Sequence, residues 1–223
     1  MYALGLLGCT DQLVSELIVG VDIAAETTIG EPNDRLGAAV ALADTVAVAV
    51  PGRETVIDDG VVTEGPSAWV GYLDGELVRG GAEALWIGEA QYEVTGARGY
   101  AVGDGEVFVA TSTELLSFPA ASVRFEGKLT GVAVVEGAPI VRLDSASGCV
   151  IRAVDGGAVF DLPCSADGAL AADGNALCAG DPEVADDEGA GTVACDDGRR
   201  VDGARGDHLG RALGGGYAMG SFN

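Results

Sequence analysis

The chain has 223 residues, of which 35 are Asp or Glu and 12 are Lys or Arg, so its net charge is −23. A field of this sign repels the phosphates of nucleic acids and anionic lipid surfaces, so we expect no nucleic-acid partner. No apolar run reaches the roughly 18 residues of a transmembrane helix, and 36 glycines among 48% hydrophobic residues favour short strands and tight turns over long helices.

The first nine residues end in Leu6-Leu7-Gly8-Cys9, which resembles a bacterial lipobox. In such signals the Cys becomes the lipidated first residue of the mature protein. The residues before this box are few and lack a basic region. We interpret residues 1–9 as a lipoprotein signal with Cys9 as the lipid anchor, and an ordinary apolar strand is the alternative.

Residues 10–29 hold one strand-like run, Leu17 to Val21, within the stretch from Glu16 to Ala25. The segment Glu31-Pro32-Asn33-Asp34 is typical of a turn. We expect the strand near Leu17 to complete the last unit of the repeat array that follows and so close a small ring; the alternative is that the array is a fragment of a longer one of six or seven units.

The repeat array begins near residue 30. Its first copy has two apolar strands between Leu36 and Pro51 that turn at Asp44, and a further strand follows from Ser67 to an Asp-Gly turn at Asp74. Partner strands start near residues 67, 106, 149 and 191, a step of about forty residues that is typical of a β-propeller. The expected units are 30–80, 81–125, 126–165, 166–205 and a partial 206–223. The predicted fold is therefore an all-β propeller of about five blades, or a fragment of a larger one.

Two tetrapeptides open copies of the repeat with closely similar residues, Asp34-Arg35-Leu36-Gly37 and Asp207-His208-Leu209-Gly210. Second strands close at Val50-Pro51-Gly52 and at Ala179-Gly180-Asp181-Pro182. This pattern resembles the FG-GAP family, the propeller repeats of integrin α-subunit heads and of many bacterial surface proteins. The resemblance covers roughly residues 30–223 and implies the propeller fold.

Many FG-GAP repeats carry an Asp-rich calcium loop between the first two strands, since a hard cation suits closely spaced oxygen ligands. Here the loop is shortened to Ala43-Asp44, to Ala172-Asp173-Gly174-Asn175 and to Gly214-Gly215-Gly216. Too few carboxylates remain for a tight site. We expect no cofactor, and calcium binding stays open.

Four of the five cysteines fall in the second half of the chain, at Cys149, Cys164, Cys178 and Cys195, while Cys9 stands apart. Their hairpin-like spacing favours two disulfides and an oxidising compartment, and buried free thiols are the alternative. Cys178 and Cys195 on consecutive strands suit a cross-strand bridge, as do Cys149 and Cys164. A Cys164–Cys178 pairing also stays open because four cysteines allow three connectivities.

Short polar motifs supply the remaining candidate sites. Arg205-Gly206-Asp207 is the tripeptide that integrins recognise, although it arises easily by chance in a chain rich in Gly and Asp. Two acidic pairs, Asp186-Asp187 and Asp196-Asp197, would hold a cation weakly if their loops converge, and are otherwise solvated loop carboxylates. Trp69 and Trp86 lie within apolar runs, which favours core packing over a sugar-stacking role.

Together these features predict a non-enzymatic protein of the bacterial cell envelope or extracellular medium, with a protein or glycan ligand bound by the loops between blades. One alternative is a carbohydrate-active enzyme on a propeller, which needs two converging carboxylates. The other is a purely structural module of the envelope.

Overall fold

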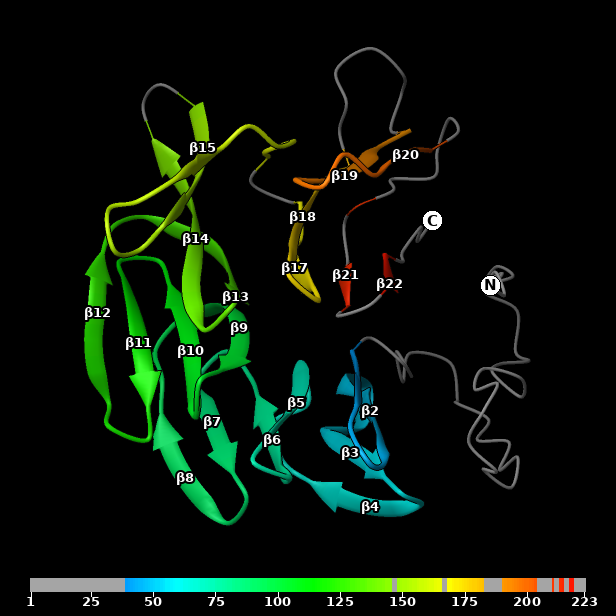
Figure 1. The fold of residues 1–223 in the computed structure, drawn as a ribbon. Helices are drawn as coiled ribbons and strands as arrows, with labels where there is room; N and C mark the ends of the chain where they lie inside the picture. The colour runs from blue at the N-terminus through cyan, green and yellow to red at the C-terminus, as the bar shows by residue number, and fades with distance from the viewer. Residues whose placement is uncertain are drawn as a thin grey trace.

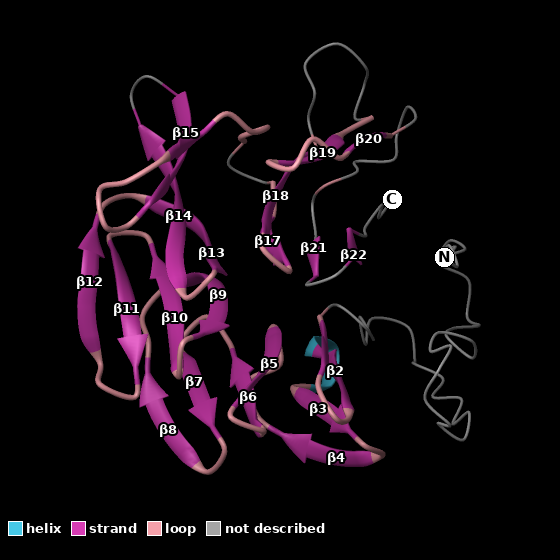
Figure 2. Cartoon of the chain, viewed as in Figure 1, coloured by secondary structure: helices cyan, strands magenta, loops and turns pink. Residues whose placement is uncertain are grey.

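A computed structural model describes residues 39–145, 148–165, 168–182, 190–203, 210, 213–214 and 217–218. Five four-stranded antiparallel sheets are arranged around a common centre as the blades of a β-propeller (Figures 1 and 2). The described residues contain one short helical turn, a 3-10 turn at Pro51–Arg53. The all-β propeller predicted from the sequence is confirmed.

In each blade the strands follow one another in sequence order. The first blade contains β1 (Val40–Leu42), β2 (Val46–Val50), β3 (Thr55–Asp58) and β4 (Val61–Glu64). The second contains β5 (Trp69–Leu73), β6 (Glu76–Gly80), β7 (Ala84–Ile87) and β8 (Ala90–Glu93). The third contains β9 (Ala97–Gly103), β10 (Glu106–Thr111), β11 (Glu114–Phe118) and β12 (Ser122–Glu126). The fourth contains β13 (Leu129–Val135), β14 (Ala138–Ser145), β15 (Gly148–Ala153) and β16 (Val159–Phe160). The fifth contains β17 (Leu170–Asp173), β18 (Ala176–Asp181), β19 (Thr192–Cys195) and β20 (Arg200–Asp202), and a hairpin of β21 (Leu213–Gly214) and β22 (Tyr217–Ala218) follows it.

The hydrophobic core lies between consecutive blades, because each sheet packs face to face against the next. One cluster joins Leu85 of the second blade to Val107 of the third, and another joins Phe108 of the third blade to Leu129 of the fourth. Since neighbours cover both faces of an inner blade, side chains of both orientations are buried along its second strand. This explains why β10 is a continuous apolar run rather than an alternating one.

The first strands of the blades lie side by side around the centre, in the order β1, β5, β9, β13 and β17. Neighbouring backbones approach closely there. A Cβ added to Gly99 of β9 would lie 3.3 Å from Cα of Gly131 in β13. Glycine and alanine in these strands therefore allow the inner edges of the sheets to meet near the axis.

Two buried arginines tie consecutive blades together. Arg79 of β6 donates to the carbonyl oxygen of Glu64, the last residue of the first blade, at 2.7 Å. Arg142 of β14 donates to the carbonyl oxygen of Gly168, just before the fifth blade, and to the side chain and carbonyl of Thr130 at 2.8 Å each. Each guanidinium thus forms a hydrogen bond to a carbonyl oxygen of, or next to, the adjoining blade, a contact that backbone pairing within one sheet cannot make.

The structure corrects the predicted repeat units. The blades begin at Val40, Trp69, Ala97, Leu129 and Leu170, so the early spacings are close to thirty residues, and only the last is near forty. The expected 80/81 boundary falls inside the second blade, and the stretch expected to hold the units 30–80 and 81–125 contains three blades. The fourth and fifth blades lie within 126–165 and 166–205.

The cause of this error is visible in the strands chosen as equivalent. The runs near residues 67, 106, 149 and 191 are a first, a second and two third strands of their blades. An apolar strand pattern does not encode the position of a strand within its sheet, because inner and middle strands are both apolar. A period taken from such runs therefore mixes strand positions.

Candidate binding face

A carboxylate stands in the turn between the first and second strands of each of the first four blades, and in the fifth blade Asp173, the last residue of β17, directly precedes the Gly174-Asn175 turn. These five residues, which we call the inner-turn carboxylates, are Asp44, Asp74, Asp104, Glu136 and Asp173. The first four side chains are exposed and Asp173 is half-buried.

Three of these turns share one backbone conformation. Asp74, Asp104 and Glu136 have φ values of 51°, 53° and 50°, and each is followed by a glycine that also has positive φ. Two consecutive residues of positive φ are typical of a type I′ turn, which matches the twist of the flanking strands. Asp is common in such turns, so geometry alone accounts for Asp74 and Asp104. Glu has no such preference, so the turn geometry does not account for the carboxylate of Glu136.

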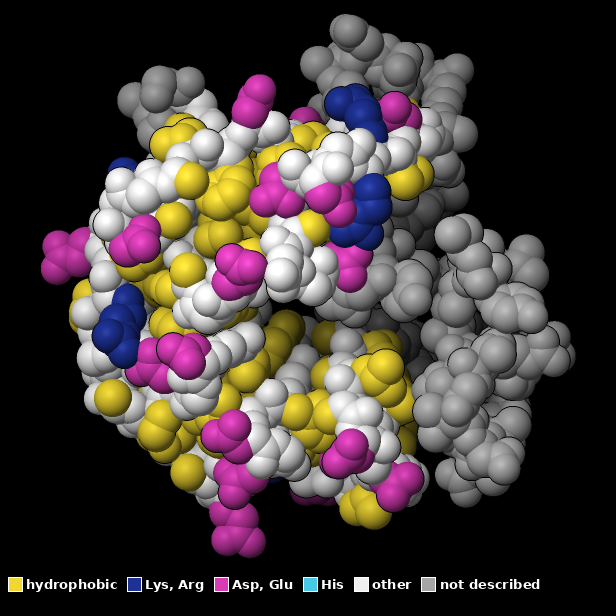
Figure 3. Space-filling view, viewed as in Figure 1, with side chains coloured by type: hydrophobic (Ala, Val, Ile, Leu, Met, Phe, Trp, Pro, Cys, Tyr) yellow, Lys and Arg dark blue, Asp and Glu magenta, His cyan; other side chains and the backbone are white. Residues whose placement is uncertain are grey.

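These turns lie at the same end of the propeller. Asp104 and Gly137, in the turns of consecutive blades, are so close that a Cβ on the glycine would lie 3.6 Å from Cβ of Asp104. In Figure 1 the turns joining β13 to β14 and β17 to β18 lie beside the centre of the ring. Figure 3 shows a hollow there, with hydrophobic side chains on its wall and Asp and Glu side chains distributed around it.

The turns between third and fourth strands add charge at this end. They carry Asp59, Glu89, Asp155, Asp196 and Asp197. Against these acidic residues, the described turns at this end contain one basic residue, Arg199. This end is therefore strongly negative, and we call it the acidic face.

A polar cluster closes the junction of the first two blades at the acidic face. Tyr72 donates to a carboxylate oxygen of Asp58 at 2.6 Å, and the hydroxyl of Thr45 donates to the same oxygen at 2.9 Å. Burial, followed by the hydrogen bond to Asp58, raises the pKa of Tyr72 to about 12. The phenol therefore stays protonated at neutral pH and fixes the position of the carboxylate.

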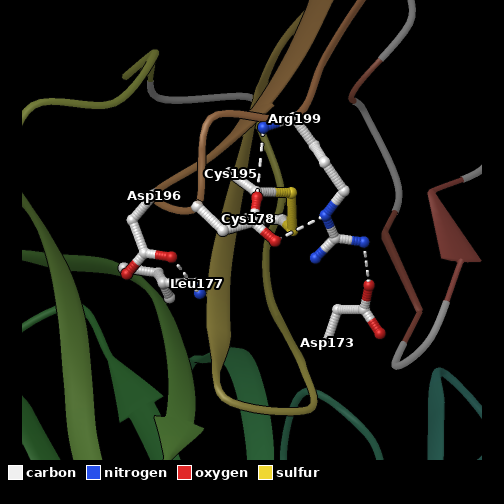
Figure 4. The surroundings of a disulfide bond; sticks show 7 residues. Asp173, Leu177, Cys178, Cys195, Asp196 and Arg199 are labelled. Carbon is white, nitrogen blue, oxygen red and sulfur yellow. Dashed lines mark hydrogen bonds and ion pairs between the residues drawn. A yellow bond between two sulfur atoms is a disulfide. The ribbon is translucent and has the colours of Figure 1, made fainter.

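Asp196 and Asp197, predicted as weak cation ligands, take separate structural partners. Asp196 accepts the backbone N–H of Leu177 at 3.0 Å (Figure 4). Asp197 accepts the backbone N–H of Arg199, which lowers the pKa of its carboxyl group, and also pairs with the guanidinium of Arg199 at 2.6 Å. The same guanidinium pairs with Asp173. The other predicted cation residues, Asp186 and Asp187, lie outside the described residues, and within the described part of the chain no three His, Cys, Asp or Glu side chains are grouped as a metal site would need.

Two disulfides are present. Cys178 and Cys195 are directly opposite each other on β18 and β19, with Cα atoms 4.0 Å apart (Figure 4). Cys149 of β15 bonds to Cys164 after β16, with Cα atoms 5.5 Å apart. Both predicted pairings are confirmed, and the Cys164–Cys178 alternative is wrong because these residues have other partners. Disulfides of this kind are typical of oxidising compartments.

Both tryptophans have packing partners, as expected. Trp69 stacks on Tyr100 of the next blade, with ring centroids 5.3 Å apart. The guanidinium of Arg79 lies 4.6 Å from the ring centroid of Trp86, a cation–π contact. These contacts occupy one face of each ring.

The lipid anchor Cys9 and the tripeptide Arg205-Gly206-Asp207 lie outside the described residues, so both stay predictions. Sequence reasoning missed the Tyr72–Asp58 contact and the convergence of the inner-turn carboxylates. A signal for the second existed in the recurrence of Asp-Gly between apolar runs, as at Asp74 and Asp104. This recurrence identifies hairpin turns, but that the turns lie at one end of the propeller becomes evident only when the blades are placed around an axis.

Comparison with known proteins shows the fold and no family. No family model matches the chain, and no curated protein matches it significantly. Among solved structures, the chain is similar to a catalytically inactive virginiamycin B lyase from Staphylococcus aureus bound to quinupristin, at 13% identity and a TM-score of 0.53, with 78% of this chain and 72% of that chain covered.

Two weaker matches each have a TM-score of 0.41. The computationally designed Ika4 protein is 10% identical, with 56% of this chain and 92% of that chain covered. BBS1N in complex with ARL6DN is 14% identical, with 60% of this chain and 56% of that chain covered. In the described residues no helix is long and apolar enough to cross a membrane.

Proposed function

We propose that the chain is a non-enzymatic binding protein that uses its acidic face to hold a positively charged partner, such as a lysine-rich segment of another protein. The observation that supports this most is the carboxylate in the inner turn of each of the first four blades, with Asp173 directly before that turn in the fifth and Glu136 standing where turn geometry does not call for an acid. Carboxylates spaced around one end focus the electrostatic field there and attract cationic groups.

Two further features agree with binding rather than acid–base catalysis. The pKa of Asp197 is lowered chiefly by the backbone N–H of Arg199, so this carboxylate stays ionised at neutral pH. Asp58 is fixed by Tyr72 and Thr45, with both hydroxyls hydrogen-bonded to the same oxygen atom. A carboxylate that stays ionised, as Asp197 does, suits ion pairing, whereas a general acid needs a raised pKa.

The proposal also includes the location and the family. The two disulfides support an extracytoplasmic location, either at the bacterial cell envelope or as a secreted protein. Membership of the FG-GAP family and lipid attachment at Cys9 are part of the same proposal and rest on the sequence patterns alone. Intact-mass measurement of protein purified from membranes tests the lipid, since a diacylated, N-acylated Cys9 adds a mass that the Cys9→Ser variant lacks.

The experiment for binding compares two variants of equal net charge. In the first, Asp44, Asp74 and Asp104 become Asn and Glu136 becomes Gln, which neutralises four inner-turn carboxylates. In the second, four exposed carboxylates at the opposite ends of the strands become Gln: Glu54, Glu83, Glu93 and Glu126. The probe is a fluorescent lysine decapeptide, followed by fluorescence anisotropy at low and physiological ionic strength.

An exposed ion pair contributes about 0.5 kcal/mol, so loss of four should raise Kd of the first variant roughly thirtyfold. The second variant should bind within about threefold of the native chain. If both variants weaken equally, the peptide responds to total charge, and the acidic face is not a binding site.

A further inference from the structure

The first blade has one covered face and one open face. Its covered face carries Ala47, Ala49 and Val56, which pack against Val70 of the second blade. Side chains alternate between faces along a strand, so the residues between these point to the other side. There Val40 is paired with Val48, Val48 with Ile57, and Ile57 with Val62.

This row crosses all four strands and is entirely aliphatic. Leu42, paired with Val46, extends it along the inner edge. We call this surface the open apolar face; Val40 is 54% exposed, Leu42 69% and Val62 62%. In the later blades the matching face packs against the preceding blade, as in the cluster of Leu85 and Val107. The open apolar face therefore has the composition of an interface between blades, and no blade among the described residues packs against it.

The last described sheet, which follows the fifth blade, is too small to be a blade. The hairpin β21–β22 packs beside β17 and β18 of the fifth blade. In Figure 1 it lies between β17 and β2, in the gap that separates the fifth blade from the first. Within the described residues the hairpin forms a sheet of two strands with no further partner. Strands of two residues cannot cover four strands of the first blade.

We propose that residues 16–25 of this chain add to the free edge of β22 and, together with the hairpin, cover the open apolar face as a sixth blade. The sequence Glu16-Leu17-Ile18-Val19-Gly20-Val21-Asp22-Ile23-Ala24-Ala25 supplies an apolar strand of suitable length. Fourteen residues separate its end from β1, and such a tether spans up to about 46 Å. The segment therefore reaches from the first blade across the gap.

The proposed arrangement removes two exposed surfaces, a strand edge and a sheet face. An exposed strand edge and an exposed aliphatic sheet face both favour aggregation. A strand contributed from the opposite end of the chain pairs the edge, and its side chains cover the face. The ring is then closed by a sheet built from both ends of the chain, so the first and last blades become neighbours.

The first test is hydrogen exchange on the full chain, followed by mass spectrometry of peptides within residues 13–25. The proposal expects these amides to exchange at least tenfold more slowly than in an unstructured peptide. Val40→Asp should return them to the unstructured rate, because it places a charge in the covered face. Val123→Asp is the matched control, since Val123 is 51% exposed and belongs to β12 of the third blade, away from both the first and the fifth blades, and it should leave the protection unchanged.

A second test places the probe on the first blade. Leu42→Cys is labelled with a thiol reagent in a Cys9→Ser background, in which the other four cysteines are disulfide-bonded. Val19→Asp, a change outside the described blades, should accelerate this labelling at least tenfold. Light scattering at several protein concentrations accompanies both tests.

Three results would overturn the proposal. Exchange of residues 16–25 at the unstructured rate shows that they do not pair. Equal labelling of Leu42→Cys with and without Val19→Asp shows that they do not cover the face. Protection that appears only as the chain dimerises assigns the face to a second copy.

Discussion

Arg142 gives a sharp test of how the blades are held together. The side chain is 3% exposed and donates to Thr130 Oγ1, to the carbonyl oxygen of Thr130 and to that of Gly168. In an Arg142→Leu variant both carbonyls lose this donor inside the protein. Hydrogen bonds from charged donors each contribute about 1.5–3 kcal/mol, and the leucine recovers part of this by apolar burial.

We expect a net loss of about 3 kcal/mol in the free energy of unfolding. For a chain of this length that loss lowers Tm by about 6–12 °C. The control is Arg124→Leu, which removes an arginine whose side chain is 44% exposed and paired with Glu106 at 2.6 Å. Exposed pairs contribute at most about 1 kcal/mol.

Differential scanning calorimetry and urea unfolding of both variants measure the difference. If Arg142→Leu is no less stable than Arg124→Leu, the buried guanidinium is not a link between the fourth and fifth blades. An increase in stability would show that burying the charge of Arg142 costs more than its hydrogen bonds return.

Three further predictions concern other contacts between strands. Replacing Cys178 and Cys195 by serine removes a disulfide with a sequence separation of 17 and should lower the free energy of unfolding by about 3 kcal/mol. The midpoint of urea unfolding measures this loss, and a midpoint equal to that of the oxidised native protein contradicts the prediction. Gly80→Ala should lower Tm by several degrees, because the added Cβ would lie 2.7 Å from the ring of Tyr100, which is held by its stacking and its hydrogen bond; an unchanged Tm shows that the ring moves freely. The pKa of Tyr72 is raised to about 12, so its stabilising contribution is complete below about pH 10 and is lost as pH rises from about 10 to 12. Tyr72→Phe should reduce this alkaline loss of stability. Urea titrations across that pH range measure the free energy of unfolding, and an equal decrease with pH in both proteins refutes the prediction.

The sequence patterns predict local pairing well. The turn at Asp44 separates β1 from β2, and the Asp-Gly pair after Leu73 separates β5 from β6. The bridge between Cys178 and Cys195 follows from two adjacent strands of one hairpin. Each of these features depends on residues close in the chain, where turn propensity and strand alternation act directly.

Features that depend on neighbouring blades are not predictable in the same way. Arg79 and Arg142 interrupt apolar strands, and a charged residue there indicates a solvent-facing position. Both are nevertheless buried, because a carbonyl from the adjoining blade accepts their hydrogen bonds. The repeat length was overestimated for a related reason, since equivalent strands are recognised by their place around the axis and not by their composition.

The location of the core between consecutive blades has a consequence for how such a chain evolves. Each cluster of buried side chains draws mainly on two blades that adjoin in sequence. Duplication of one blade-length segment therefore adds a single new interface, and deletion of an inner blade replaces its two interfaces by one between its former neighbours, while the remaining interfaces stay intact. Change in blade number is then a small genetic step, and a circular permutation that opens the chain between Glu93 and Ala97 would keep every blade whole.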